Sequence, residues 1–346
     1  MKQYSIKLLA LTLACLLLLP LVLSACAQKP EESLETPSDE ISEIPEEPME
    51  MKVYALNGTT ALGMAQMIHK AKNNTDTMNY NITLHTAADA ITGAIVSGEC
   101  AIAALPTNVA AKLYKASNGK VQLLALNTLG VLYLLDTTGS VQSLNDVKGK
   151  TVYLPGAGSN PEFITAALMK AANLNVGTDV FLDTTSYPSP DELQTAIIAG
   201  KVQLAVLPEP KVSVVTTKKS DVSVALDLTA EWEKLNGENT LIQGCLVVNK
   251  AFAEAHPNEI AQFLADYKAS VEFIKGGSEE AITMITEAGI LPNSAIANKA
   301  LPKCNICYIA GADMQPIAKI FYEKLFALNP ASIGAVPDEG FYYVSQ

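Results

Sequence analysis

One pattern in this sequence recurs about 100 residues along the chain, and it constrains the fold more than any other feature. The segment 98–106 runs from a glycine through an apolar stretch to a Leu-Pro pair, and 200–208 repeats that pattern in register. A looser repeat relates 53–58 to 152–156, because each is an apolar run that ends at a glycine turn. These repeats fit either the general likeness of all α/β units or two lobes of related topology.

From Met51 onward, apolar runs alternate with segments of helical character. The runs that we interpret as strands are 53–56, 82–84, 101–105 and 121–126. Segments 61–71 and 88–97 lie between them and are predicted to be helices. This alternation predicts an α/β fold in which each lobe is a mostly parallel sheet flanked by helices.

Two further stretches, 127–135 and 243–249, are predicted to cross between the lobes. A chain that crosses twice places 51–127 and 243–346 in lobe 1, and 128–242 in lobe 2, with a hinge between them. Open α/β sheets bind ligands outside the carboxyl ends of their strands, so two such lobes that face each other make a cleft.

Local signals predict two particular helices. Pro257 suits the first turn of a helix whose apolar residues, Ile260, Phe263 and Tyr267 among them, recur at helical spacing. Ser189 and Glu192 make a capping box with a proline at the first helical position.

The N-terminus has the pattern of an export signal. Lys2 and Lys7 precede an apolar run at 8–23, which is shorter than the roughly 20 residues of a bilayer span. The run ends in Leu-Ser-Ala-Cys, which resembles the bacterial lipobox. We therefore predict a signal peptide at 1–25 and lipidation of Cys26; the alternative is an uncleaved anchor helix.

The segment 26–50 has a different composition from the rest of the chain. Nine acidic residues accompany a single lysine, Lys29, and prolines are interspersed. Like-charge repulsion and proline keep such a segment extended. It is predicted to be a disordered acidic linker between the lipid anchor and the lobes.

Charge composition restricts the ligand. All 24 basic residues are lysines and the net charge is −12, which argues against a nucleic-acid partner. Without arginine, no bidentate cationic fork can hold a carboxylate or sulfonate. We expect a small neutral or weakly charged ligand with several hydrogen-bonding atoms, such as a pyrimidine-like heterocycle. Tyr187 and Trp232 are either stacking partners for a flat ligand or core residues.

The loops after the repeated strands are the candidate binding site. A glycine turn that opens a helix at 156–160 also offers backbone N–H groups to an anionic group. The predicted ligand-binding residues are Asn57, Gly58, Thr59, Thr60, Pro106, Thr107, Asn108, Gly156, Ala157, Gly158, Ser159, Asn160, Pro208 and Glu209.

Catalytic and metal-binding patterns are sparse. His69, His85 and His256 lack metal-ligand spacing, and we find no nucleophile elbow, Walker loop or full dinucleotide fingerprint. Cys304 and Cys307 form a C-x-x-C, but no second pair completes a zinc site. They are either structural thiols or an incidental disulfide. We predict no enzyme activity, cofactor or metal.

Several motifs together resemble a known family. They are the lipobox, Lys-Gly-Lys-Thr-Val-Tyr-Leu-Pro-Gly-Ala-Gly-Ser at 148–159, Val-Leu-Pro-Glu-Pro at 206–210, Asn-Pro-Ala-Ser-Ile-Gly at 329–334 and Phe-Tyr-Tyr at 341–343. The chain resembles ABC-transporter substrate-binding lipoproteins of the sulfonate, nitrate, taurine and thiamine-precursor group.

The resemblance implies a type II periplasmic-binding-protein fold, whose two hinged lobes close on a small solute. It also implies a monomer on the outer face of the bacterial cytoplasmic membrane or in the periplasm, which delivers solute to an ABC permease and its ATPase. Two alternatives remain open. One is a ligand-sensing or adhesive surface lipoprotein without transport. The other is an enzyme like the pyrimidine-precursor synthases of this fold, whose clustered-cysteine motif this sequence lacks.

Overall fold

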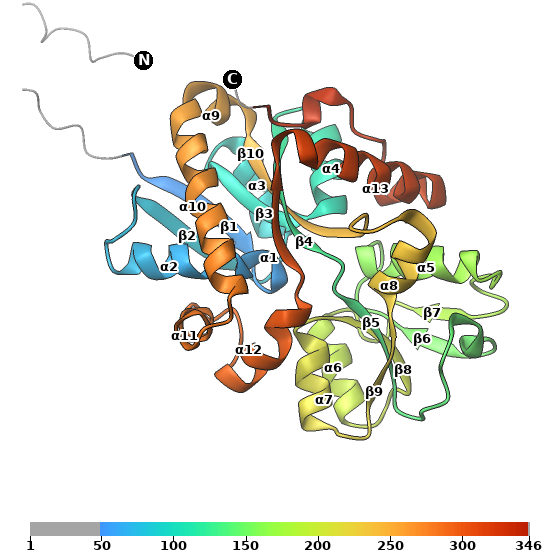
Figure 1. The fold of residues 1–346 in the computed structure, drawn as a ribbon. Coiled ribbons are helices and arrows are strands. Elements are labelled where there is room, and N and C mark those ends of the chain that lie inside the picture. Colours follow the sequence, from blue (N-terminus) through green and yellow to red (C-terminus); the bar gives the residue numbers. More distant parts are fainter. Residues whose placement is uncertain (1–48, 345–346) are drawn as a thin grey trace, which may run out of the picture. The chain divides into compact units, whose positions relative to one another are not determined.

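Two β-sheets organise the part of the chain that the computed structural model describes, residues 49–344 (Figure 1). The predicted signal peptide, Cys26 and the linker up to residue 48 lie outside the described residues. Among residues 49–344, no helix combines the length and hydrophobicity needed to cross a bilayer.

The first lobe is built on a six-stranded sheet in the order β11-β4-β10-β3-β1-β2. Its strands are β1 Met51–Leu56, β2 Tyr80–His85, β3 Ile102–Pro106, β4 Val121–Leu129, β10 Ile242–Asn249 and β11 Ile306–Ala310. Its helices are α1 Thr59–Leu62, α2 Ala65–Lys72, α3 Asp89–Ser97, α4 Thr107–Ala116, α9 Lys250–Ala255, α10 Pro257–Lys275, α11 Glu279–Glu287, α12 Ser294–Ala300 and α13 Met314–Leu328.

The second lobe is built on a five-stranded sheet in the order β7-β6-β8-β5-β9. Its strands are β5 Leu132–Asp136, β6 Thr151–Tyr153, β7 Phe181–Asp183, β8 Leu204–Pro208 and β9 Ser223–Asp227. Its helices are α5 Asn160–Ala171, α6 Pro190–Ile198, α7 Lys211–Lys218 and α8 Leu228–Asn236. Short 3-10 helices span Leu144–Val147, Leu301–Lys303, Gly311–Asp313, Pro330–Ser332 and Glu339–Phe341.

The two sheets share one topology, as the sequence repeats indicated. In each, the first strand of the repeat (β1 or β6) pairs in parallel with the strand before the Leu-Pro loop (β3 or β8). In each, the strand that arrives from a crossing (β10 or β5) runs antiparallel to both of its neighbours. The predicted two-lobed α/β fold is confirmed, although the crossing strands make both sheets mixed.

Local predictions agree with the structure except at one helix. The capping box is present at Ser189, whose hydroxyl accepts a hydrogen bond from the Glu192 backbone N–H at 3.2 Å. The helix predicted over 61–71 is wrong as a single element, because α1 ends before Gly63 and α2 begins after it. A Cβ at Gly63 would lie 2.5 Å from the Tyr267 hydroxyl oxygen, so α10 packs directly against the backbone at this break.

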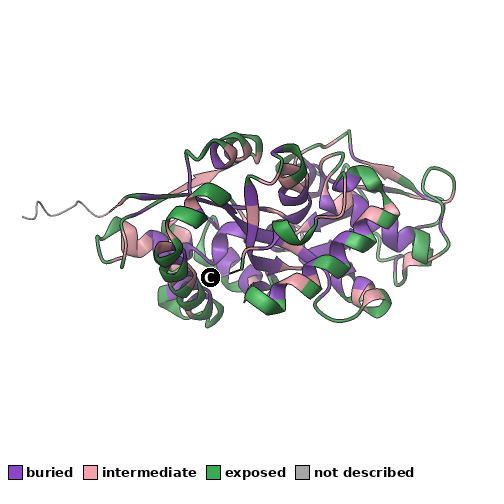
Figure 2. Ribbon diagram, turned by 90° about the horizontal axis from the view of Figure 1, so that it is seen from above, coloured by how far each residue is buried: buried purple, intermediate pink, exposed green. Residues whose placement is uncertain are grey.

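Buried residues occupy the interior of the ribbon (Figure 2), and one apolar cluster includes residues from strands of both sheets. It includes Leu105 from β3 and Val206 from β8, each completely or almost completely buried. Trp232 of α8 lies within it, with its ring centroid 6.0 Å from that of Phe321 in α13. Trp232 is therefore a core residue, and the alternative role as a stacking partner for a ligand does not fit its position.

Candidate ligand-binding cavity

Residues of both lobes line a cavity of about 310 Å³, at the small end of the range for ligand sites. Ten of the predicted site residues line it: Asn57, Thr59, Thr60, Pro106, Asn108, Ala157, Gly158, Ser159, Asn160 and Pro208. The carboxyl ends of β1, β3 and β8 therefore meet at one place, as the placement of the repeats predicted.

The loop between β1 and α1 is held by hydrogen bonds at both ends. The Asn57 backbone N–H donates to the carbonyl of His85 at the end of β2, at 2.8 Å. The Asn57 side-chain oxygen accepts from the backbone N–H of Gly58, whose φ of 121° favours glycine. The Thr60 hydroxyl donates to the carbonyl of Leu56 at 2.5 Å. These hydrogen bonds hold the loop that contributes Asn57, Thr59 and Thr60 to the cavity wall.

The glycine turn of the second lobe precedes α5. Gly156 and Gly158 both have positive φ, of 69° and 73°. The Glu162 carboxylate, one turn into the helix, accepts a hydrogen bond from the Gly158 backbone N–H at 2.5 Å. The Ser159 hydroxyl donates to the carbonyl of Pro155 at 2.9 Å. The Glu162 carboxylate therefore accepts from a backbone N–H group, that of Gly158, which the sequence analysis had expected to be available to an anionic ligand.

Direct hydrogen bonds join the lobes beside the cavity. The Asn160 side-chain N–H donates to the Thr107 hydroxyl oxygen at 3.1 Å, and the Asn108 side chain donates to the carbonyl of Gly158 at 3.4 Å. Thr107 in turn donates to the carbonyl of Ile242 in the second crossing at 3.0 Å. The two predicted loops are therefore in contact, as in a closed arrangement of the lobes.

Four predicted residues lie outside the lining: Gly58, Thr107, Gly156 and Glu209. The Thr107 side chain faces Ile242 and Asn160 instead. Glu209 is 1% exposed and accepts hydrogen bonds from the backbone N–H and hydroxyl of Ser213, at 3.1 and 3.0 Å. Burial raises the pKa of the Glu209 carboxyl above its ordinary value, although Ser213 opposes that rise. Its carboxylate thus supports α7.

The sequence analysis missed six lining residues, most of them apolar. Val131, Leu132 and Gln243 come from the two crossings, so the crossings form part of the cavity wall. Their position between the lobes was a usable signal, because any residue at a crossing lies next to the cleft. The other residues that were missed are Leu56, Val109 and Pro161.

Charged side chains are missing from this cavity wall, which consists of Asn, Gln, Ser and Thr with apolar residues and glycine. Within residues 49–344, no three His, Cys, Asp or Glu side chains lie close enough to hold a metal ion. Tyr187 lies elsewhere, beside Tyr153 with ring centroids 5.8 Å apart. Its stacking role at this cavity is not supported by its position.

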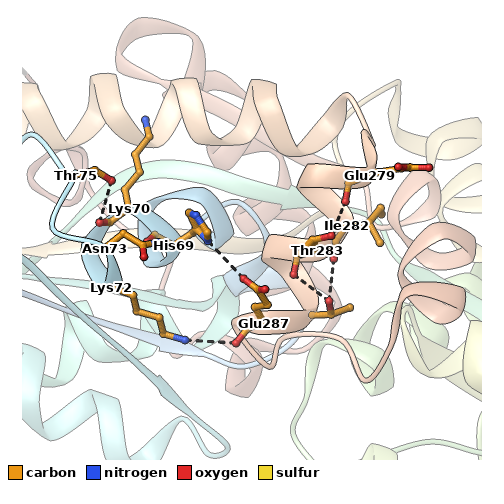
Figure 3. A network of polar contacts seen from close by, with 10 residues as sticks. His69, Lys70, Lys72, Asn73, Thr75, Glu279, Ile282, Thr283 and Glu287 are labelled. Carbon is orange, nitrogen blue, oxygen red and sulfur yellow. Dashed lines mark hydrogen bonds and ion pairs between the residues drawn. The ribbon is translucent and has the colours of Figure 1, made fainter.

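The remaining chemical candidates lie away from the cavity. His69 of α2 lies beside Glu287 of α11, with 3.6 Å between Nδ1 and Oε2, and Lys72 donates to the carbonyl of Glu287 (Figure 3). Cys304 and Cys307 are both buried free thiols, and burial raises the pKa of Cys307 to about 12. Neither thiol is therefore ionised at neutral pH.

Comparison with known proteins relates the chain to transport proteins. Residues 120–281 match the family model described as NMT1/THI5 like. The chain is similar to an ABC transporter protein from Parabacteroides distasonis, with 25% identity, a TM-score of 0.72, and coverage of 86% of this chain and 99% of that one. No curated protein matches the chain significantly.

Two sulfonate-binding proteins share the fold. The periplasmic aliphatic sulphonate-binding protein SsuA from Escherichia coli has 15% identity and a TM-score of 0.70, over 87% of this chain and 94% of that one. The alkanesulfonate-binding protein SsuA from Xanthomonas axonopodis pv. citri, bound to MOPS, has 13% identity and a TM-score of 0.63, over 84% and 96%. Residues 120–281 therefore resemble the NMT1/THI5-like family, and the chain has a two-lobed periplasmic binding protein fold; the predicted resemblance to the substrate-binding proteins of ABC transporters is confirmed.

Proposed function

We propose that this protein is the extracytoplasmic solute-binding component of an ABC importer, which captures a small molecule between its lobes and delivers it to the permease. The observation that carries the proposal is the cavity of about 310 Å³ whose wall is shared by both lobes and both crossings. A solute bound there contacts both lobes at once, so its affinity depends on closure.

The lobes move as two bodies in this proposal. Residues 51–127 with 243–346 form one body and 128–242 the other, and the crossings near Gly130 and Ile242 act as the hinge. Opening breaks the Asn160–Thr107 and Asn108–Gly158 hydrogen bonds and admits solute. Ligand then shifts the population toward the closed state. Small-angle scattering should show a smaller radius of gyration with ligand; an unchanged radius at saturation would contradict the motion.

The anchor belongs to the same proposal. Signal cleavage leaves Cys26 as the lipidated N-terminus, and the acidic linker spaces the lobes from the outer face of the membrane. Cells fed a fatty-acid probe should label the wild-type protein and the Cys15→Ala control, but not Cys26→Ala. Equal labelling of all three would contradict lipidation at Cys26.

Mass spectrometry of solute that co-purifies from the natural host tests the binding role. Val131→Phe places a larger side chain in the cavity wall, whereas Val224→Phe adds the same group at a position 40% exposed on β9. Solute should be lost from Val131→Phe and retained by Val224→Phe, with thermal unfolding used to verify that both variants fold. Solute retained by both variants would contradict binding at this cavity.

A further inference from the structure

Asn160, a residue that lines the cavity, has one buried polar atom without a partner. The residue is 5% exposed, and its side-chain oxygen Oδ1 is buried and accepts no hydrogen bond. Such an unpaired buried acceptor costs stability unless a ligand supplies a donor. Asn160 lines the cavity at the start of α5.

The hydrogen-bond network determines which way the Asn160 amide faces. The Thr107 hydroxyl proton is already donated to the carbonyl of Ile242, so its oxygen can only accept from Asn160. The amide nitrogen must therefore face Thr107, at 3.1 Å, and Oδ1 must face the other way. The neighbouring groups therefore identify the unpaired atom as the amide oxygen, which is an acceptor. The opposite orientation of the amide would place this oxygen against the Thr107 oxygen, which has no proton left to donate.

Two hydroxyl groups of the lining residues have also used their protons within the chain. Ser159 donates its proton to the carbonyl of Pro155, and Thr60 donates its proton to the carbonyl of Leu56. Both oxygens keep acceptor capacity only, because a hydroxyl has a single proton. Together with Asn160 Oδ1, they contribute three acceptors to the lining, to which Thr59 and Gln243 also bring donor groups.

Positive charge does not balance these acceptors. None of the residues that line the cavity is a lysine or histidine, and the chain has no arginine. The Glu162 carboxylate takes the Gly158 N–H, which adds negative charge beside the turn. A sulfonate or carboxylate placed against Asn160 would set oxygen lone pairs against lone pairs, without a cation to offset its desolvation.

We propose that the ligand is a small neutral molecule that donates a hydrogen bond to Asn160 Oδ1, and that Asn160 selects it over anions that only accept. The inference rests on the proposed solute-binding function. Leu56, Val109 and Val131 give the same cavity an apolar side, so the ligand pairs its N–H or O–H donor with an apolar portion. Ligand chemistry here therefore differs from the sulfonates named for the two SsuA proteins of the same fold.

Calorimetric titration with matched pairs of probes tests the ligand class. Each pair keeps one skeleton and exchanges a neutral donor for an anion: ethanesulfonamide with ethanesulfonate, and nicotinamide with nicotinate. The neutral member of at least one pair should bind at least 10-fold more tightly than its anion. Equal or tighter binding of the anions, or no binding by any neutral member, would overturn the inference.

A second titration assigns the selectivity to Asn160. Asn160→Leu removes Oδ1 and should weaken binding of the neutral probe about 10- to 100-fold, since it leaves a ligand donor unpaired. Thr107→Val breaks the same Asn160–Thr107 hydrogen bond but keeps the amide, and it should weaken binding far less. Thr165→Val is the control on the same helix, at a residue outside the cavity lining. It removes a buried hydroxyl that, like Asn160 Oδ1, has no hydrogen-bond partner, and it should leave affinity unchanged.

These outcomes separate the inference from the proposed function. Equal weakening by Asn160→Leu and Thr107→Val would overturn the role of Oδ1, because the lost contact between lobes would then explain both. Tight binding of anions alone would overturn the inference while supporting a solute-binding cavity. Thermal unfolding of each variant without ligand verifies that it is folded at the titration temperature.

Discussion

The two Leu-Pro loops, one in each lobe, start from the same backbone and then serve different purposes. β3 and β8 are both five residues long, have four buried residues, and end in a half-buried proline at the cavity. The chain continues as Thr107 and Asn108 in the first lobe, but as Glu209 in the second. Thr107 and Asn108 form hydrogen bonds with residues of α5 and its preceding turn, whereas Glu209 accepts hydrogen bonds from Ser213 in its own lobe.

The difference shows that strand repeats position a loop without fixing its role. A hydroxyl or amide after the proline can reach across to the other lobe. A buried carboxylate needs strong donors of its own, and the nearest are at the start of the following helix. One loop therefore joins the lobes, and the other stabilises the lobe that contains it.

Removing the carboxylate is expected to have the largest effect on stability. Glu209→Ala leaves the N–H and hydroxyl of Ser213 without their partner and opens a cavity, so the free energy of unfolding should fall by about 2–4 kcal/mol. Urea denaturation measures this loss. Glu209→Gln keeps an acceptor for Ser213 and should lose much less; a loss under about 1 kcal/mol for the alanine variant would contradict the structural role.

The first-lobe loop should show coupling between the lobes that the second-lobe loop lacks. Thr107→Val leaves the Ile242 carbonyl and the Asn160 N–H unpaired, and should lower the free energy of unfolding by about 1–3 kcal/mol. A double-mutant cycle with Asn160→Leu should give a coupling energy of about 0.5 kcal/mol or more. The matched cycle of Ser213→Ala with Asn160→Leu should be additive, and coupling of similar size in both cycles would remove the distinction between the loops.

A smaller effect concerns pH and the second loop alone. Burial raises the pKa of Glu209 above its ordinary 4.5, so the folded protein keeps a proton that the unfolded chain releases. This contribution to stability is complete below pH 4.5 and is lost as pH rises through the folded pKa. The stability of Glu209→Gln relative to wild type should therefore improve as the pH rises from about 4.5 toward neutrality. Urea denaturation across this range checks it, and a decline would contradict the direction.

The smallest effect on stability is expected for a contact away from both Leu-Pro loops. It provides a reference against which the effects at the two loops can be compared. His69→Gln removes the contact of the His69 imidazole with the Glu287 carboxylate, between α2 and α11, in which both side chains are partly exposed (Figure 3). Exposed pairs contribute little, so the free energy of unfolding should change by less than about 0.5 kcal/mol. Thermal unfolding can detect a larger change, which would show that this network supports the first lobe more than its exposure indicates.

The fold could be predicted well because its signals are local. Buried apolar runs marked β1, β3 and β10, and the capping residues marked α6. The break at Gly63 could not be predicted, since the residue that packs closely against it, Tyr267, lies on a helix about 200 residues further along. The local sequence indicates which secondary structure a segment prefers, but it does not indicate which other element packs against that segment.

The same limit explains the candidate site. Placement of the loops brought Asn57 and Asn108 to one cavity, because they follow neighbouring strands at one edge of the first sheet. Asn160 lines the same cavity from the second lobe, where it follows β6. The directions of the side chains depended on partners elsewhere: Thr107 on Ile242, and Glu209 on Ser213. Val131 and Leu132 were recognised as part of a crossing, yet their role as cavity wall follows only from how the lobes meet.

The strand order of the first lobe has a consequence for how this chain can be assembled. β10 lies between β3 and β4, although more than one hundred residues separate β4 from β10 in the sequence. During synthesis, the second lobe is complete before the middle strand of the first lobe has been made. Until then β3 and β4 each present an unpaired edge, and such edges favour intermolecular pairing. Chains that end near residue 240 should therefore show slow amide exchange in the second lobe but fast exchange along β3 and β4, and they should aggregate more readily than full-length chains.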